Sequence, residues 1–328
     1  MDDAPWQHVL RAAVRDPDEL CRRLELPPEW LEGARRAAAS FPVFVPQPYL
    51  DRIRRGDPAD PLLRQVLPVG DELADQPGFS ADPVGDLAVR SLPGLLQKYD
   101  GRSLMITTGA CAVHCRYCFR RHYPYHESPR SVDDWQPALD RLRADESVEE
   151  VLLSGGDPLT LVDSTLAQLA ARLADIPHLR RLRVHSRVPI VIPKRVTSEL
   201  IGWLRGTRLT PFMVVHVNHP AEIDDAVERA LGRLIDAGIP VLNQAVLLRG
   251  VNDDPEVLFR LSRRLIDCRV IPYYVNQLDR VAGAAHFEVP RSRGLELLAH
   301  LPPRLPGYAV PRYVEDLGSH SHKNVITR

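Results

Sequence analysis

The chain has 328 residues and is almost electroneutral, with 42 Lys and Arg against 43 Asp and Glu. That length allows one large domain or two ordinary ones, and a net charge of -1 gives no footprint for a polyanion, so we expect no nucleic-acid partner. The sequence has neither an apolar run of 18 residues nor a secretory leader, so we expect a cytoplasmic protein without membrane association.

The first hundred residues are rich in proline and predict a partly helical, otherwise irregular extension. Helical patterns occur at 18–24 and 29–39, and nine prolines between positions 42 and 93 interrupt the segment that follows. We therefore divide the chain into an N-terminal extension (1–100), a main unit (101–300) and a short C-terminal segment (301–328).

From about residue 103, strand-like apolar runs alternate with amphipathic helical patterns. The six runs span 104–107, 151–154, 182–185, 212–217, 241–247 and 270–274. This alternation predicts parallel βα units in an α/β fold, as an open doubly wound sheet or a barrel-like arc, because six units are too few for a closed eight-stranded barrel. Both architectures place ligands at the C-terminal ends of the strands, where most of the unusual polar segments of this chain lie.

Three of the five cysteines fall within eight residues in a CxxxCxxC pattern: Cys111, Cys115 and Cys118. An odd, clustered set without a secretory leader does not predict disulfide bonds. Three thiolates on one loop can hold three corners of a [4Fe-4S] cluster and leave the fourth iron open to a small molecule. Structural zinc is the alternative, but it prefers four ligands, and no fourth candidate lies at an ordinary spacing.

The CxxxCxxC loop after the first strand, with Tyr117 before its last cysteine, resembles the radical S-adenosylmethionine superfamily. The resemblance implies a partial (βα)6 barrel whose open iron chelates S-adenosylmethionine. One electron then releases a 5′-deoxyadenosyl radical that removes an unactivated hydrogen. The end of the second strand resembles the segment that contacts the methionyl group of this cofactor, through Ser154, Gly155, Gly156 and Asp157.

Longer segments resemble the lysine 2,3-aminomutase family. They are CAVHCRYCFRRHYPY (111–125), LSGGDPL (153–159), VHSRVPIVI (184–192), NQAVLLRGVN (243–252) and GAAHF (283–287). Three N-terminal segments are similar to the shorter bacterial members, which make (R)-β-lysine for elongation factor P. These are DPLLRQVL (60–67), PGFSADP (77–83) and PGLLQKY (93–99).

The family resemblance implies pyridoxal 5′-phosphate as a further cofactor. Its aldehyde carries the migrating amino group, and the resting enzyme needs a lysine to hold that aldehyde as a Schiff base. The chain has only three lysines, Lys98, Lys194 and Lys323. Lys323 matches the cofactor-bearing lysine of the family, although His320 and His322 stand where relatives have a glycine-rich run, and these histidines have no assigned role.

Five further positions match residues with family roles. Arg102 and Gln244 match residues that hold the pyridoxal phosphate group, and Arg120 matches the arginine that pairs with the substrate α-carboxylate. Asp279 and Asp316 match the two carboxylates that bind the ε-ammonium of lysine, and such a pair favours a cationic substrate over a neutral or acidic one.

The resulting hypothesis is an isomerase, an L-lysine 2,3-aminomutase whose product (R)-β-lysine is attached to elongation factor P by a separate ligase. We expect a reductant such as flavodoxin or ferredoxin and no structural zinc, and we leave a homo-oligomer open. The alternatives are a catabolic lysine 2,3-aminomutase, a mutase for glutamate or another amino acid, and a non-enzymatic iron–sulfur or zinc interaction module.

Overall fold

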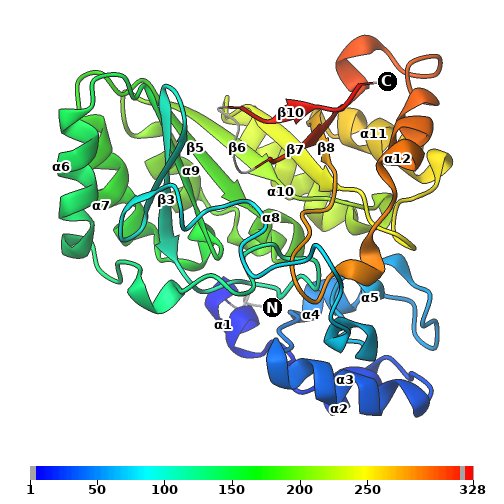
Figure 1. The fold of residues 1–328 in the computed structure, drawn as a ribbon. Helices are drawn as coiled ribbons and strands as arrows, with labels where there is room; N and C mark the ends of the chain where they lie inside the picture. Colours follow the sequence, from blue (N-terminus) through cyan, green and yellow to red (C-terminus); the bar gives the residue numbers. More distant parts are fainter. Residues whose placement is uncertain (1–4, 318–321, 328) are drawn as a thin grey trace.

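The computed structural model describes residues 5–317 and 322–327, which form one sheet flanked by helices (Figure 1). All six predicted strands are present, as β3 (Arg102–Thr108), β4 (Glu150–Gly155), β5 (Arg181–Ser186), β6 (Thr210–Val215), β7 (Val241–Val246) and β8 (Ile271–Asn276). They are parallel neighbours in chain order. The α/β class and the arc of six βα units are thus confirmed.

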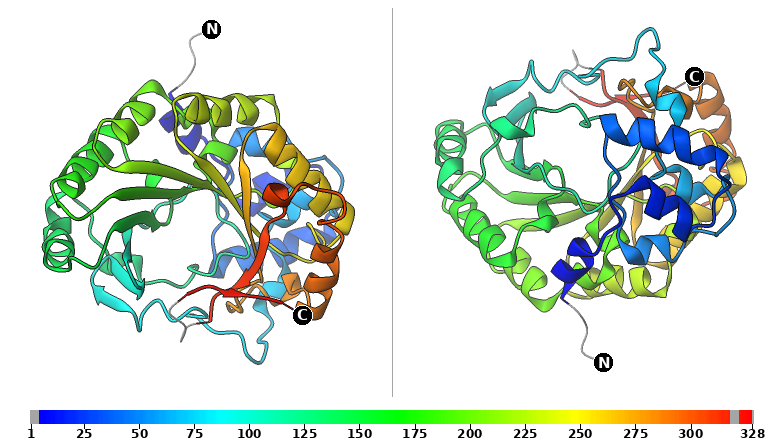
Figure 2. Two further views of the ribbon diagram at one scale, coloured as in Figure 1. Left: turned by 90° about the horizontal axis from the view of Figure 1, so that it is seen from above. Right: turned by 90° about the horizontal axis from the view of Figure 1, so that it is seen from below.

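Four further strands extend the sheet at its two edges. A hairpin of β1 (Arg90–Leu92) and β2 (Leu95–Tyr99) pairs antiparallel with β3. At the other edge β9 (Arg312–Glu315) pairs parallel with β8, and β10 (Asn324–Val325) pairs antiparallel with β9. The sheet curves into an arc, and its two edges approach each other across the opening (Figure 2).

Helices cover the outer face of the arc, as Figure 2 shows from above. The larger ones are α6 (Gln136–Ala144), α7 (Asp163–Ala174), α9 (Ser198–Arg205), α10 (Asp225–Asp236), α11 (Pro255–Asp267) and α12 (Arg291–Ala299). In α10 the Asp224 side chain accepts from the Val227 amide and caps the helix N-terminus, and the buried face repeats at the helical period: Val227, Ala230, Leu231 and Leu234.

The N-terminal extension is folded against the rest of the chain and contains α1 (Trp6–Arg11), α2 (Pro17–Arg23), α3 (Glu29–Ser40), α4 (Gln47–Leu50) and α5 (Pro61–Arg64). These helices lie in the lower part of the molecule in the view of Figure 1. The remaining short helices are α8 (Val188–Val191) and the 3₁₀ turns Gly70–Leu73, Tyr125–Glu127, Asp133–Trp135, Pro158–Thr160, Pro193–Arg195, Pro220–Glu222, Ala285–Phe287 and Gly307–Ala309. Buried side chains of the extension belong to the same hydrophobic core as those of the sheet.

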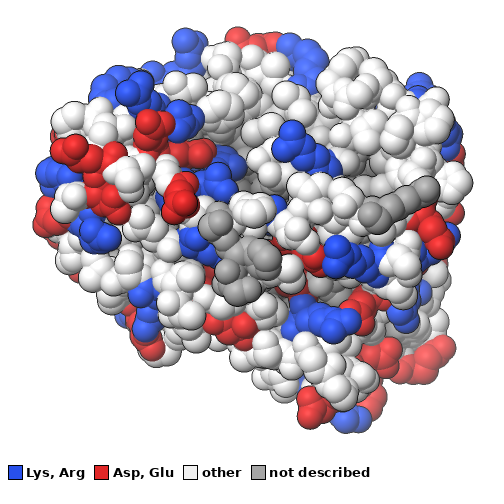
Figure 3. All heavy atoms as spheres, turned by 45° about the horizontal axis from the view of Figure 1, so that its top comes forward, with Lys and Arg blue, Asp and Glu red and all other residues white. Residues whose placement is uncertain are grey.

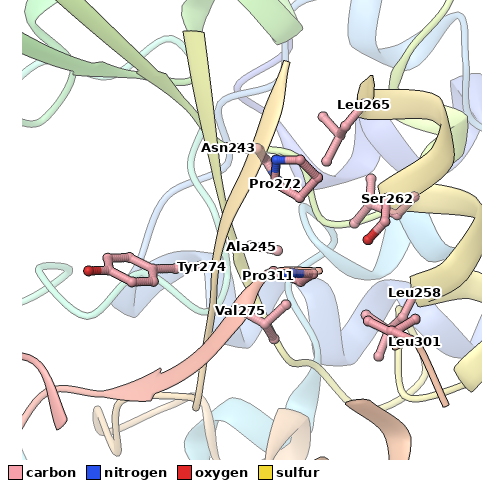
Figure 4. A pocket seen from close by; sticks show the side chains of 11 residues that line it. Asn243, Ala245, Leu258, Ser262, Leu265, Pro272, Tyr274, Val275, Leu301 and Pro311 are labelled. Atoms are coloured by element: carbon pink, nitrogen blue, oxygen red, sulfur yellow. The ribbon is translucent and has the colours of Figure 1, made fainter. Parts of the chain in front are cut away.

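The two faces of the sheet differ in burial: the face toward the helices is fully buried, and the inner face of the arc is partly exposed. The buried face carries residues such as Val151, Leu153, Val184, Val215 and Val275. Figure 4 shows this face against α11, where a cavity of ≈ 10 Å³ remains, about the smallest space that holds one water. Tyr274 points away from this cavity, toward the inside of the arc. Because successive side chains of a strand point to opposite faces, every second side chain of each strand lies on the inner face, where it can contact a ligand.

Charged side chains of both signs are interspersed on the face drawn in Figure 3. This agrees with the near-zero net charge of the chain. Among the helices in the described part of the chain, none combines the length and the apolar character needed to cross a bilayer.

Candidate active site

The strand register places several of the sequence-predicted residues on the inner face of the arc. Arg102 pairs with Glu150, and alternation from there puts Ser154 and His185 on the same face. Further along the sheet, Gln244 lies opposite Tyr274 on that face. Arg102 and Gln244 are four strands apart, about 19 Å along the sheet. Because the sheet is curved, both lie on its concave face (Figure 2).

The cysteine loop follows β3 at the C-terminal end of the strands, and the N-terminal extension holds it in place. The His114 amide donates to the Phe44 carbonyl at 3.0 Å, and the Arg116 amide donates to the Gln65 carbonyl at 2.9 Å. The Arg116 guanidinium is fully buried and pairs with Glu72 at 2.6 Å. The predicted extension therefore immobilises the loop that carries Cys111, Cys115 and Cys118.

The two glycines at the end of β4 allow that strand to approach the cysteine loop closely. A Cβ on Gly156 would lie 2.3 Å from the Ala110 carbonyl oxygen, and Gly155 has φ +123°, a conformation that favours glycine. The Gly156 and Asp157 amides donate to the Thr108 and Ala110 carbonyls, both at 2.7 Å. The Gly156 and Asp157 amides thus join the chain after β4 to the start of the cysteine loop.

Asp157 is buried and organises the chain after β5. Its carboxylate accepts from the Ser186 hydroxyl at 2.7 Å and from the Arg187, Val188 and Leu159 amides at 2.7, 3.2 and 3.0 Å. Burial raises its pKa to about 6, although these four donors oppose the rise, so the carboxylate is ionised at neutral pH. In the structure these four donors surround Asp157, which the sequence assigned to cofactor binding.

Arg120 is buried beside the end of β4. Its Nε donates to Asp86 at 2.7 Å, and a terminal nitrogen donates to the Ser154 hydroxyl at 3.1 Å. The sequence prediction paired Arg120 with a substrate carboxylate, and in the structure the carboxylate of Asp86 is in contact with it. Asp86 was not predicted, because a single aspartate in a proline-rich segment carries no motif.

Lys323 lies against the end of β8, close to two carboxylates. Its amine donates to the Asn276 side-chain oxygen at 2.6 Å and lies 5.8 Å from the centre of the Tyr274 ring. Burial lowers its pKa, while the charges of Asp279 and Asp316 oppose that change. Burial likewise raises the pKa of Asp279 to about 7, against the attraction of Lys323.

Asp316 follows β9 and meets the opposite edge of the arc. One carboxylate oxygen accepts from the Lys98 ammonium, and the other accepts from the Tyr99 hydroxyl at 2.9 Å. Lys98 also donates to the Val84 carbonyl at 2.9 Å, and the Arg102 guanidinium lies 4.6 Å from the centre of the Tyr99 ring. The structure thus brings Lys98, Asp316, Asp279 and Lys323 into one cluster.

Of the two histidines without an assigned role, His322 is exposed, and His320 lies outside the described residues.

Two inner-face histidines were not predicted. The ring centres of His185 and His216 are 6.1 Å apart, and burial holds the pKa of both well below the ordinary value for histidine, so both are neutral at pH 7. The Nε2 atom of His185 is buried and has no hydrogen-bond partner. The register of β5 and β6 would have indicated their shared face once the strands were assigned.

The fold and the cysteine loop define a class of enzyme. Residues 105–201 match the model of the radical SAM superfamily, and this segment contains the cysteine loop and the Gly-Gly strand end. The protein is therefore a radical SAM enzyme, and the alternative prediction of a non-enzymatic iron–sulfur or zinc interaction module is wrong.

Curated relatives narrow the family. The chain is 42% identical over 324 residues to the L-lysine 2,3-aminomutase of Haemophilus influenzae, covering 99% of this chain and 96% of that protein. It is 43% identical over 322 residues to that of Escherichia coli, covering 98% and 94%. To that of Clostridium subterminale it is 36% identical over 312 residues, covering 95% and 75%. The chain belongs to the L-lysine 2,3-aminomutase family, whose members are isomerases.

Membership of the superfamily implies a [4Fe-4S] cluster and S-adenosylmethionine. The donor set fits the cluster, because one loop carries three cysteine sulfurs, and they lie close enough for a thiolate on one to help raise the pKa of another. Within residues 5–317 and 322–327, no group of three His, Cys, Asp or Glu side chains is arranged around a single shared ion. In a [4Fe-4S] cluster each cysteine binds a different iron.

Proposed function

We propose that the protein is an L-lysine 2,3-aminomutase that uses pyridoxal 5′-phosphate together with its iron–sulfur cluster and S-adenosylmethionine. One observation carries the proposal: the amine of Lys323 lies inside the arc beside two carboxylates, in a chain that belongs to this family. A lysine amine near paired carboxylates suits both an aldehyde cofactor and a diamino acid substrate.

Lys323 would hold the aldehyde of pyridoxal phosphate. Burial lowers its pKa and so increases the neutral fraction of the amine, the form that attacks an aldehyde. Arg102 and Gln244 would hold the phosphate, since the planar guanidinium fork matches phosphate geometry. When bound, this cofactor supplies an electrophilic aldehyde that can carry an amino group between adjacent carbons. Asn276 orients the Lys323 amine at 2.6 Å.

The carboxylates would select the cationic end of the substrate. Lys98 carries the same primary ammonium group as a lysine substrate, and Asp316 accepts a hydrogen bond from it while the Tyr99 hydroxyl binds the second carboxylate oxygen. This contact supports Asp316 as an ammonium site, with Asp279 as its neighbour. Arg120 would take the substrate carboxylate by exchanging its contact with Asp86. An acidic substrate such as glutamate would meet two like charges at the distal end.

The cysteines would hold the cluster, and the end of β4 (Ser154, Gly155, Gly156 and Asp157) would form the wall of the S-adenosylmethionine site. Asp157 acts there by fixing the segment after β5 rather than by direct contact. We further propose (R)-β-lysine as the product, a cytoplasmic location, a flavodoxin or ferredoxin as reductant, and delivery of the product to elongation factor P through a ligase. The resemblance of 60–67, 77–83 and 93–99 to the shorter bacterial members supports this part.

The test is an amino-acid panel under anaerobic conditions. Reconstituted enzyme is supplied with a reductant, S-adenosylmethionine, pyridoxal phosphate and one amino acid at a time, and products are separated on a chiral phase. We expect turnover of L-lysine to (R)-β-lysine and none of glutamate. Turnover of glutamate without lysine would overturn the substrate assignment. A mass increase of elongation factor P, when factor and ligase are added, tests the downstream step separately.

A further inference from the structure

A buried arginine, Arg187, contacts the cysteine loop. Arg187 follows β5 and is 6% exposed, and one of its terminal nitrogens donates to the sulfur of Cys115 at 2.7 Å. This arginine belongs to VHSRVPIVI, one of the family-like segments, but no motif assigns it a role. A charged donor on a cysteine sulfur is a strong interaction, because hydrogen bonds from ionised groups exceed neutral ones.

A network from three separate segments fixes the guanidinium. Its other terminal nitrogen donates to Gln65 at 2.6 Å and to Glu222 at 2.9 Å. Gln65 belongs to the N-terminal extension and Glu222 to the short helix after β6. The Asn218 side chain donates to Gln65 at 3.0 Å and to the Tyr117 hydroxyl at 2.7 Å. The network leaves one guanidinium nitrogen directed at Cys115.

Arg187 is also positioned through its backbone. Its amide donates to the buried Asp157 carboxylate at 2.7 Å, so the segment directly after β4 positions the backbone of the arginine. Glu222 is fully buried, and its other oxygen accepts from the Asn218 and His219 amides at 2.9 and 3.0 Å. The arginine and the glutamate form a neutral pair, and the guanidinium also contacts the Cys115 sulfur, which would be a thiolate when it binds iron.

We propose that Arg187 is a positioning residue that sets the reduction potential of the [4Fe-4S] cluster through its hydrogen bond to the Cys115 sulfur, with Glu222 as the counter-charge. Hydrogen bonds to cluster sulfurs and the net charge around the cluster are the protein's means of setting its potential. A cationic donor stabilises the reduced cluster, which carries one more negative charge. Glu222 partly neutralises the arginine and limits that effect. The two side chains therefore act on the potential in opposite directions.

The test is a redox titration of the reconstituted cluster, followed by electron paramagnetic resonance without lysine, pyridoxal phosphate or S-adenosylmethionine. It compares the wild type with Arg187→Met, Arg187→Lys and Glu222→Gln after iron and sulfide have been quantified. The matched control is Arg195→Lys. Arg195 is also fully buried and ion-paired, with Asp163 at 2.8 Å, but its hydrogen bonds go to Asp163 and to carbonyls after β4.

We expect Arg187→Met to lower the reduced-to-oxidised ratio at a fixed ambient potential about tenfold, equivalent to about 59 mV for one electron. Arg187→Lys keeps the charge but loses the planar fork, so it shifts the ratio in the same direction by less. Glu222→Gln raises the ratio, and Arg195→Lys leaves it unchanged.

A wild-type ratio in cluster-loaded Arg187→Met would overturn the proposal. If neither Arg187 variant retains iron, Glu222→Gln decides it, and an unchanged or lowered ratio in that variant overturns it. Because no amino acid is present, this result is independent of whether lysine is the substrate.

Discussion

Asp157 gives the sharpest test of how the strand end after β4 works. The change is Asp157→Asn, which preserves shape and replaces one carboxylate oxygen by an NH₂ group. In the structure one oxygen accepts from Leu159 and Ser186, and the other accepts from the Arg187 and Val188 amides. The new NH₂ group faces one of these donor pairs. One buried amide then loses its acceptor: Leu159 on one side, since the Ser186 hydroxyl can accept from an NH₂ group, or Arg187 on the other, since the Val188 amide also donates to the Ser186 hydroxyl at 3.0 Å.

The expected loss of stability follows from that one unpaired amide. A buried donor left without an acceptor costs about 1–3 kcal/mol, so the free energy of unfolding falls by about that amount. The measurement is denaturant unfolding of the apo-protein, with Asp133→Asn as control. The side chain of Asp133 is 91% exposed, and its substitution changes the free energy of unfolding by less than about 0.5 kcal/mol.

One outcome would refute this reasoning. If Asp157→Asn leaves the free energy of unfolding equal to that of the wild type and weakens only S-adenosylmethionine binding, Asp157 contacts the cofactor directly and its network is dispensable. We expect instead that stability and iron content fall together, since Arg187 and the cysteine loop depend on the same strand end.

Three further predictions follow from the site. Lys323→Ala should abolish the absorbance band of bound pyridoxal phosphate, whereas Lys194→Ala should retain it; the reverse result would move the Schiff base elsewhere. The apparent KM for lysine should rise as pH falls below about 7, because burial raises the pKa of Asp279 to about 7 and the protonated acid no longer attracts an ammonium. Asp279→Asn should weaken lysine binding and remove that pH dependence, and an unchanged profile in this variant would exclude Asp279 as its source. Gly156→Ala should reduce cluster loading, because the added Cβ would lie 2.3 Å from a carbonyl of the cysteine loop; Gly202→Ala, with nothing within 4 Å, is the control and should load normally.

The sequence by itself determined the six βα units and the class of enzyme. Strand runs and helix faces are written as local periodicities, and CxxxCxxC is a spacing within one loop, so neither needs distant residues to be recognised. The strands β9 and β10, of four and two residues, are too short to carry such a pattern. They form because the edge of β8 offers unpaired backbone groups.

Only the tertiary structure decided which charged residues act together. Lys98 and Asp316 are 218 positions apart, and Arg187 contacts Gln65 from 122 positions away. With 39 arginines in the chain, no local signal separates Arg187 from a surface residue. A buried charged side chain needs a partner of opposite charge, because its desolvation costs more free energy than local backbone preferences contribute. That partner can lie anywhere in the sequence. Those pairings exist only once the sheet has curved and its segments have packed together, and the Arg187 pairing helps to hold the cysteine loop.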